Sequence, residues 1–328
     1  MRVARGFRPS RPRSGRAAWL AAGTAALLAA SLLTPGFSPA AAAAAEPDAL
    51  CGSGPLEILL TNDDGFDSAG IRALAAGLAA AGHRVTLAAP ARNASGSSMG
   101  FTWGEIPVRQ VTADPPVFAV DATPASVVVL AATALYPAGR RPDLVVSGIN
   151  HGPNDGALLM LSGTVGAAIA GTLLLDPPVP GIAVNAGRLN AVEPWDSPAH
   201  LAQFDAVAAH LARLVGASRA WFCDRGRVTR PRTVLNVNYP ALAPGQWRGT
   251  VVAGQDTASD LHFDFEATAG GKYKPRPLRS NPPAARGSDR DGLARGCVTV
   301  TPLGAEIVDD TASAGTPARA LTRRLRDL

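Results

Sequence analysis

Cysteine is scarce in this chain. Among 328 residues there are three, at Cys51, Cys223 and Cys297. They form no Cys-x-x-Cys pair and no cluster with histidine, which argues against a structural zinc site. Outside the cell we would expect one disulfide and one free thiol, and the sequence leaves all three pairings open. A dinucleotide-binding loop is missing as well, because no Gly-x-Gly-x-x-Gly follows the first predicted strand.

Without residues 1–45 the chain also has no net positive charge. The whole sequence has 31 Lys and Arg residues against 26 Asp and Glu residues. Residues 1–45 contain six of the arginines and no acidic residue, so 25 basic residues then face 26 acidic ones. The sequence pI of about 9.6 reflects that segment. The composition therefore does not predict binding to a nucleic-acid duplex.

Residues 1–45 have the three parts of a secretory signal peptide. An arginine-rich start precedes an uncharged run over residues 17–33, and an alanine-rich stretch ends at Ala45. We predict cleavage near Ala45, giving a secreted or extracytoplasmic protein without a membrane span. The arginines are never adjacent, so the general secretory route is favoured over the twin-arginine route. A retained N-terminal anchor is the alternative.

Beyond this segment, short apolar stretches alternate with helical patterns. The expected strands are residues 58–60, 85–89, 117–120, 143–147, 179–184 and 233–237. Helices are expected to follow from about residues 71, 124, 165 and 200. This alternation predicts an α/β core over residues 46–240, a Rossmann-like three-layer fold whose mostly parallel sheet is covered on both faces. Residues 241–328 should form an irregular C-terminal extension with an arm over 254–296, a last strand over 297–302 and a helix over 318–328.

Polar residues follow three of the expected strands. Asn62-Asp63-Asp64-Gly65 comes after the first strand, Ser95 lies in the loop after the second, and Asn150 ends the loop after 143–147. Loops at the carboxyl ends of parallel strands converge at one sheet edge. Two adjacent carboxylates repel each other unless a cation neutralises them, and these oxygen ligands suit Mg²⁺ or Mn²⁺. The simpler alternative is a helix-capping Asp beside a turn Gly.

The segment Ser162-Gly163-Thr164 opens another expected helix. Backbone N–H groups at such a position can bind an anion such as a phosphate. An ordinary helix cap is the alternative interpretation.

These motifs occur in order along most of the mature chain and together resemble the SurE family of stationary-phase survival nucleotidases. The matching stretches are Ile58-Leu59-Leu60-Thr61-Asn62-Asp63-Asp64-Gly65, Ala69-Gly70-Ile71, Ala89-Pro90, Arg92-Asn93, Ser95-Gly96, residues 143–150, Gly152-Pro153-Asn154, Ser162-Gly163-Thr164-Val165 and Thr301-Pro302-Leu303.

The resemblance implies a metal-dependent phosphomonoesterase that acts on nucleoside monophosphates, as a 5′- or 3′-nucleotidase. It implies one divalent cation per subunit, Mg²⁺ or Mn²⁺, and a homo-oligomer. The metal ligands would be Asp63, Asp64, Ser95 and Asn150. The residues on the substrate side would be Asn62, Asn154, Ser162, Gly163 and Thr164. Asp63 or Asp64 would also orient or deprotonate the attacking water, and a covalent aspartyl-phosphate is the alternative mechanism.

Two other functions remain open at this point. Residues 96–100 fit the Gly-x-Ser-x-Gly pattern of serine hydrolases, with Ser98 as the nucleophile, although a strand-like stretch follows where that motif needs a helix. A secreted protein that binds nucleotide or metal without turnover is the second alternative. His151 adjoins Asn150, so supporting the metal ligands without binding the metal itself is one interpretation of this residue.

Overall fold

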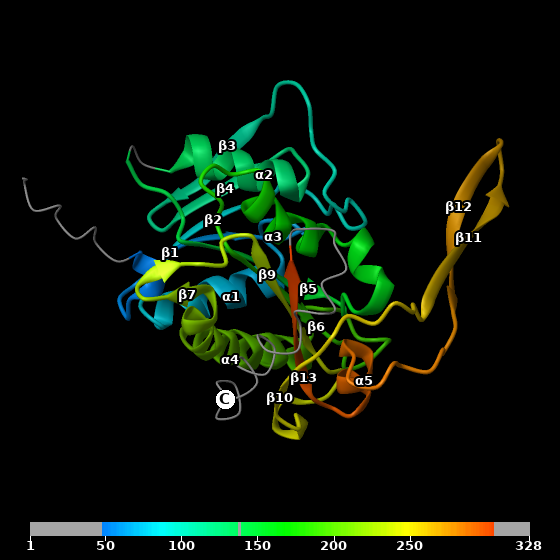
Figure 1. Ribbon diagram of the computed structural model, residues 1–328. Coiled ribbons are helices and arrows are strands. Elements are labelled where there is room, and N and C mark those ends of the chain that lie inside the picture. Colours follow the sequence, from blue (N-terminus) through cyan, green and yellow to red (C-terminus); the bar gives the residue numbers. More distant parts are fainter. Residues whose placement is uncertain (1–47, 137–138, 305–328) are drawn as a thin grey trace, which may run out of the picture. The chain divides into compact units, whose positions relative to one another are not determined.

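A computed structural model describes residues 48–136 and 139–304. Within this part the chain forms a mixed sheet of nine strands in the order β10-β13-β9-β6-β5-β1-β2-β4-β3 (Figure 1). The strands of this sheet are β1 (Glu57–Thr61), β2 (Arg84–Pro90), β3 (Val108–Ala113), β4 (Pro116–Val120), β5 (Leu144–His151), β6 (Gly181–Ala186), β9 (Thr233–Tyr239), β10 (Thr250–Val252) and β13 (Val298–Gly304).

The first strand lies at the centre of the parallel part of the sheet. It pairs in parallel with β2 on one side and β5 on the other. Parallel pairing continues from β5 to β6 and β9, and from β2 to β4. The antiparallel pairs are β3 with β4 and β13 with β9. The mostly parallel sheet expected from the strand and helix alternation is therefore confirmed.

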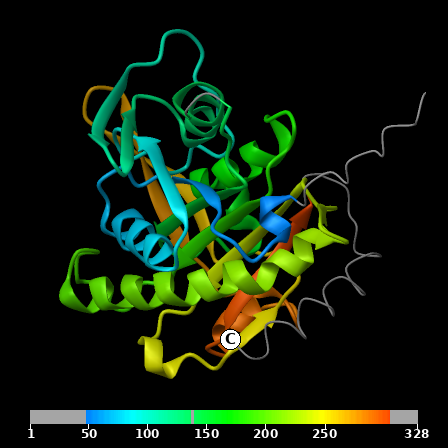
Figure 2. The same cartoon turned by 90° about the vertical axis from the view of Figure 1, so that its left-hand side faces the viewer.

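Helices cover both faces of the sheet. On one face α1 (Ala69–Ala80) packs along the long helix α4 (Pro198–Phe222), and on the other α2 (Pro124–Leu130) packs against α3 (Gly163–Leu173) (Figure 2). Side chains alternate across a strand, so Ile58 and Leu60 enter the core under α1 and α4 while Leu59 enters the core under α2 and α3. Because β1 is buried on both faces, it consists of consecutive apolar residues.

The structure differs from the sequence-based expectations in several places. Residues 147–150, expected to form a loop, are the last part of β5, because pairing with β6 resumes at Asn150 after a register shift that follows Ser147. The expected arm contains an antiparallel hairpin of β11 (Leu261–Thr268) and β12 (Lys272–Arg279), followed by the short helix α5 (Asp289–Ala294). The signal peptide and the helix expected at 318–328 lie outside the described residues.

One of the three possible cysteine pairings is formed. Cys51 and Cys223 are joined by a disulfide with Cα atoms 5.6 Å apart, and Cys297 is a buried free thiol. Cys51 precedes β1 and Cys223 directly follows α4, so the bond ties the start of the described chain to the end of the longest helix. The expectation of one disulfide and one free cysteine is confirmed.

Removing this disulfide should lower the free energy of unfolding by about 2–4 kcal/mol, because it closes a long loop and restricts the unfolded chain. The two cysteines are 172 positions apart. Urea denaturation with and without reductant measures the effect in the wild type and in the Cys51→Ser/Cys223→Ser variant. Cys297→Ala serves as the matched control and should keep the reductant sensitivity of the wild type. A wild type indifferent to reductant would contradict the prediction.

None of the helices in residues 48–136 and 139–304 combines the length and the hydrophobicity of a membrane span.

Candidate functional site

The loop after β1 is shaped by the buried side chain of Asn62. Its Nδ2 donates to the Gly65 carbonyl and to Ser68 Oγ, each at 2.9 Å, and its Oδ1 accepts the Gly65 N–H at 3.2 Å. Gly65 has a φ of 116°, which side-chain-bearing residues rarely adopt. Asn62 is 0% exposed. It therefore holds the loop that presents Asp63 and Asp64, and its expected contact with substrate stays a prediction.

Asp63, in the loop after β1, lies in space beside the N-terminus of α3. Its Oδ1 accepts a hydrogen bond from the Thr164 hydroxyl at 2.6 Å, and the backbone N–H groups of Gly163 and Thr164 also donate to the carboxylate. The residue is only 3% exposed. Burial raises the pKa of Asp63, and the donors from α3 partly offset this effect.

Asn150 reaches the same hydroxyl from the end of β5. Its Oδ1 lies 3.1 Å from Thr164 Oγ1, while its Nδ2 donates away from the site to the Gly152 carbonyl at 2.9 Å. The Asp63, Thr164 and Asn150 oxygens thus share a single hydroxyl hydrogen. The excess of lone pairs in this group favours a bound cation or an additional proton.

Asp64 turns toward a different neighbour. Its Oδ2 accepts the backbone N–H of His151 at 3.1 Å, and its Oδ1 lies 3.2 Å from His151 Nδ1. Burial, followed by repulsion from Asp63, raises the pKa of Asp64 to about 7. Burial also lowers the pKa of His151 to about 4, so the imidazole is neutral near pH 7. Among the described residues no Lys or Arg pairs with either aspartate.

The loop that contains Ser95 lies against the backbone of Asp63. The Ala94 N–H donates to the Asp63 carbonyl at 2.7 Å, which fixes the loop beside Asp63. Ser95 itself is exposed, and its N–H donates to Asn93 Oδ1 at 3.0 Å. Ser97 Oγ, farther along the loop, is buried without a hydrogen-bond partner in the described part of the chain.

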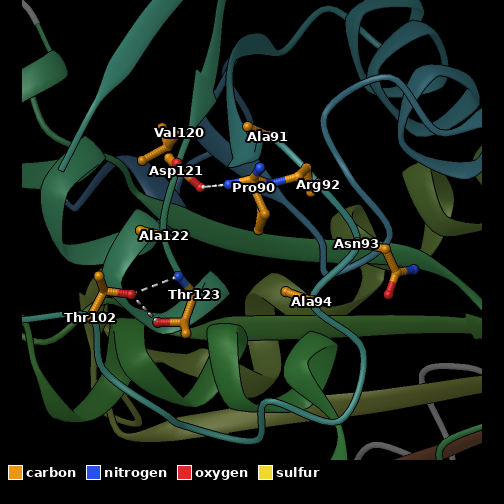
Figure 3. A pocket seen from close by; sticks show the side chains of 10 residues that line it. All are labelled: Pro90, Ala91, Arg92, Asn93, Ala94, Thr102, Val120, Asp121, Ala122 and Thr123. Atoms are coloured by element: carbon orange, nitrogen blue, oxygen red, sulfur yellow. Dashed lines mark hydrogen bonds and ion pairs between the residues drawn. The ribbon is translucent and has the colours of Figure 1, made fainter.

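A pocket of about 270 Å³, lined by both polar and apolar residues, opens beside this loop, between the ends of β2 and β4 (Figure 3). Arg92 pairs with Asp121 at 2.7 Å on one wall, and Thr102 bonds to Thr123 on another. Because Ala94 also lines it, the pocket lies next to the Asp63 loop. The lining residues are Pro90, Ala91, Arg92, Asn93, Ala94, Thr102, Val120, Asp121, Ala122 and Thr123.

The first turn of α3 uses its free N–H groups within the protein. Ser162 caps the helix by accepting the Val165 N–H at 3.1 Å, as in the helix-cap interpretation. Gly163 and Thr164 donate to Asp63. Gly163 and Thr164 therefore hold a carboxylate in this structure and Ser162 caps the helix, and a phosphate contact from these three residues stays a prediction.

Asn154 belongs to a buried network that the sequence analysis missed. Its Nδ2 donates to Asn185 Oδ1 at 2.7 Å, and its N–H donates to Asn238 Oδ1 at 2.8 Å. Asn236 Nδ2 donates to the Asn154 carbonyl at 2.7 Å. Three of these asparagines lie in β6 and β9 and are 0% exposed. The signal was available in the sequence, because asparagine is unusual inside apolar strands.

The serine-hydrolase alternative finds no support in the geometry. Ser98 Oγ donates to the Met160 carbonyl at 2.8 Å, and no histidine of the described residues is bonded to it. Residues 101–107 form neither helix nor strand, whereas the motif needs a helix after the serine.

The donor set fits a hard divalent cation. The described residues contain no group of three or more His, Cys, Asp or Glu side chains that could hold a metal. The ligands expected here are instead two carboxylates with an amide and a hydroxyl oxygen. The two aspartates are buried with raised pKa values, and three oxygens share one hydrogen. A bound cation would neutralise the carboxylates and accept the unshared lone pairs of these oxygens.

Comparisons with known proteins agree with one another. The family model described as survival protein SurE matches residues 58–260. The 5′-nucleotidase SurE of Solidesulfovibrio magneticus is 36% identical over 281 residues, which cover 80% of this chain and 97% of the relative. The 5′-nucleotidase SurE of Desulfovibrio desulfuricans is 37% identical over 266 residues, covering 77% of this chain and 95% of the relative.

A solved structure gives the same result. The crystal structure of the SurE protein from Aquifex aeolicus matches with a TM-score of 0.61 at 30% identity, covering 81% of this chain and 99% of that one. The fold, the family model and the identity to relatives along nearly their whole length lead to one conclusion: this chain belongs to the SurE family.

Proposed function

We propose that this protein is a divalent-cation-dependent phosphomonoesterase that hydrolyses nucleoside monophosphates. The observation that carries the proposal is the meeting of Asp63 and Asn150 at the Thr164 hydroxyl, at the carboxyl edge of the adjacent parallel strands β1 and β5. Relatives that align along most of this chain bear the name 5′-nucleotidase SurE. The family membership supports the reaction, and the oxygen donors support the cation.

In this reaction a water oxygen attacks phosphorus, the bond from phosphorus to the nucleoside oxygen breaks, and that oxygen takes up a proton. The products are the nucleoside and inorganic phosphate. When bound, Mg²⁺ or Mn²⁺ supplies positive charge that polarises the phosphoryl group. Asp63, Asp64, Ser95 and Asn150 would hold the cation. One of the two carboxylates would also orient or deprotonate the water, and the pocket lined in part by Ala94 leaves room for part of the substrate.

Export and assembly are further parts of the proposal. The arginine-rich start, apolar run and alanine stretch of residues 1–45 support a cleaved signal peptide, and the Cys51–Cys223 disulfide suits an oxidising compartment. A homo-oligomer is supported by the β11–β12 hairpin, which extends away from the nine-stranded sheet (Figure 1). Its side chains Phe263, Phe265 and Tyr273 are 49%, 67% and 69% exposed. Such aromatic side chains are common in protein interfaces.

Phosphate release from a panel of 5′- and 3′-mononucleotides tests the function directly. We expect release in the presence of Mn²⁺ or Mg²⁺, loss of release in EDTA, and recovery when the cation is returned. Full activity in EDTA would overturn the cation dependence. Nucleotide binding by calorimetry without any phosphate release would favour the binding-protein alternative.

A further inference from the structure

The two adjacent aspartates make contact with different parts of the fold. Asp63 bonds to α3, whereas both oxygens of Asp64 face one residue, His151 at the end of β5. The backbone N–H of His151 donates to Oδ2, and its ring Nδ1 lies 3.2 Å from Oδ1. With a cation bound, Asp64 would be ionised and could only accept hydrogen bonds, so the hydrogen in the second contact would belong to Nδ1. Both oxygens of the Asp64 carboxylate thus contact a single residue, one through a backbone hydrogen bond and the other through the imidazole ring.

The orientation of the His151 ring is set by aromatic packing. It stacks on Trp195 with ring centres 4.9 Å apart and an interplanar angle of 13°, and on Phe204 at 5.6 Å and 19°. Trp195 is itself fixed by Phe204, by His200 and by the Arg188 guanidinium over its face. The other ring nitrogen of His151 is buried and has no hydrogen-bond partner in the described part of the chain. Asp64 is therefore the polar group toward which the imidazole is directed.

We propose that His151 is a positioning residue that fixes the Asp64 carboxylate in the orientation in which it binds the cation. The inference rests on the proposed function, since it takes Asp64 as a cation ligand. A carboxylate whose two oxygens both contact a fixed residue keeps its remaining lone pairs in nearly constant directions and loses little further freedom when the cation binds. Trp195 and Phe204 contribute indirectly, because they prevent the imidazole from turning away.

Two substitutions at position 151 separate the hydrogen bond from the packing. His151→Asn keeps a side-chain N–H close to the place of Nδ1, whereas His151→Leu keeps an apolar side chain against Trp195 and Phe204 without a donor. The measurements are the Mn²⁺ dissociation constant by calorimetry on chelator-treated protein, kcat and KM for one nucleotide at saturating Mn²⁺, and the melting temperature.

We expect His151→Leu to weaken Mn²⁺ binding about 10–100-fold, as removal of a residue behind a metal ligand commonly does. His151→Asn should recover most of the affinity, and KM should change less than kcat in both variants. The control His210→Leu removes another buried imidazole, whose partners are Tyr239 and Thr250. It should lower the melting temperature and leave Mn²⁺ affinity at the wild-type value.

Wild-type Mn²⁺ affinity in His151→Leu would overturn the positioning role. Equal losses in the Asn and Leu variants would also overturn it, because they would show that only the ring packing matters. If the wild-type protein neither binds Mn²⁺ nor releases phosphate, the proposed function itself is wrong, and the positioning role falls with it. Failure of the positioning role alone is recognised by a wild type that binds Mn²⁺ and releases phosphate.

Discussion

Asp63→Asn is expected to abolish measurable turnover, a loss of roughly 10³-fold or more in kcat. The substitution removes one of the two negative charges that would compensate the cation and keeps nearly the same side-chain shape. Thr164 can still donate its hydroxyl hydrogen to the remaining oxygen at position 63. Burial already disfavours the charge of Asp63, so the cation-free variant should be no less stable than the wild type at neutral pH.

The measurement combines phosphate release with circular dichroism and thermal unfolding in EDTA. Asp67→Asn is the matched control, because Asp67 lies in the same loop with an exposed side chain and should tolerate the change. Asp63→Asn with wild-type rates would contradict the scheme. A variant that is inactive and also unfolded in EDTA would show that Asp63 holds the fold together and would leave its role as a ligand without support.

Gly163→Ala is expected to have the second largest effect, a fall in kcat of about 10–100-fold, since small displacements of reacting groups are costly. A Cβ atom at this position would lie 2.6 Å from Ser97 Oγ and 2.8 Å from Asp63 Oδ2. Contacts this short force a neighbour to move, and Asp63 would be pushed away from the donors at the start of α3.

Stability provides a second readout for this variant. Alanine usually stabilises a helix relative to glycine, by up to about 1 kcal/mol. The contacts of the new Cβ should outweigh this gain and destabilise the fold by about 1–3 kcal/mol. Gly216→Ala, in α4 where a Cβ meets no atom within 4 Å, is the matched control and should keep full activity with equal or higher stability. Unchanged kcat in Gly163→Ala would show that Asp63 can shift without consequence.

Much of the core could be predicted because its signals are local. Three consecutive apolar residues at 58–60, and a similar run at 144–146, indicate strands buried on both faces, and such strands are parallel in α/β folds. The outer strands gave no such signal. All six residues of β3 are exposed, and β10 is only three residues long, so neither has an apolar pattern. They form because an edge of the sheet is available to them, which depends on the tertiary fold.

The site was predictable where its residues directly follow the ends of parallel strands. Placing polar residues after parallel strands correctly brings Asp63, Asn150 and the start of α3 together. The sequence could not show that the N–H groups of α3 are directed at Asp63 and not left open for a substrate. It also could not show that Trp195 packs on His151, because the two residues are 44 positions apart and meet only where the segment before α4 lies against the end of β5.

The divergence of Asp63 and Asp64 matters for anyone who would engineer this protein. One carboxylate is anchored to the layer formed by α2 and α3, and the other, through His151 and Phe204, to the layer formed by α1 and α4. Laboratory evolution could therefore retune each carboxylate separately, with substitutions beneath α3 acting on one and substitutions along α4 acting on the other. Libraries confined to a single layer would leave one of the two carboxylates unchanged.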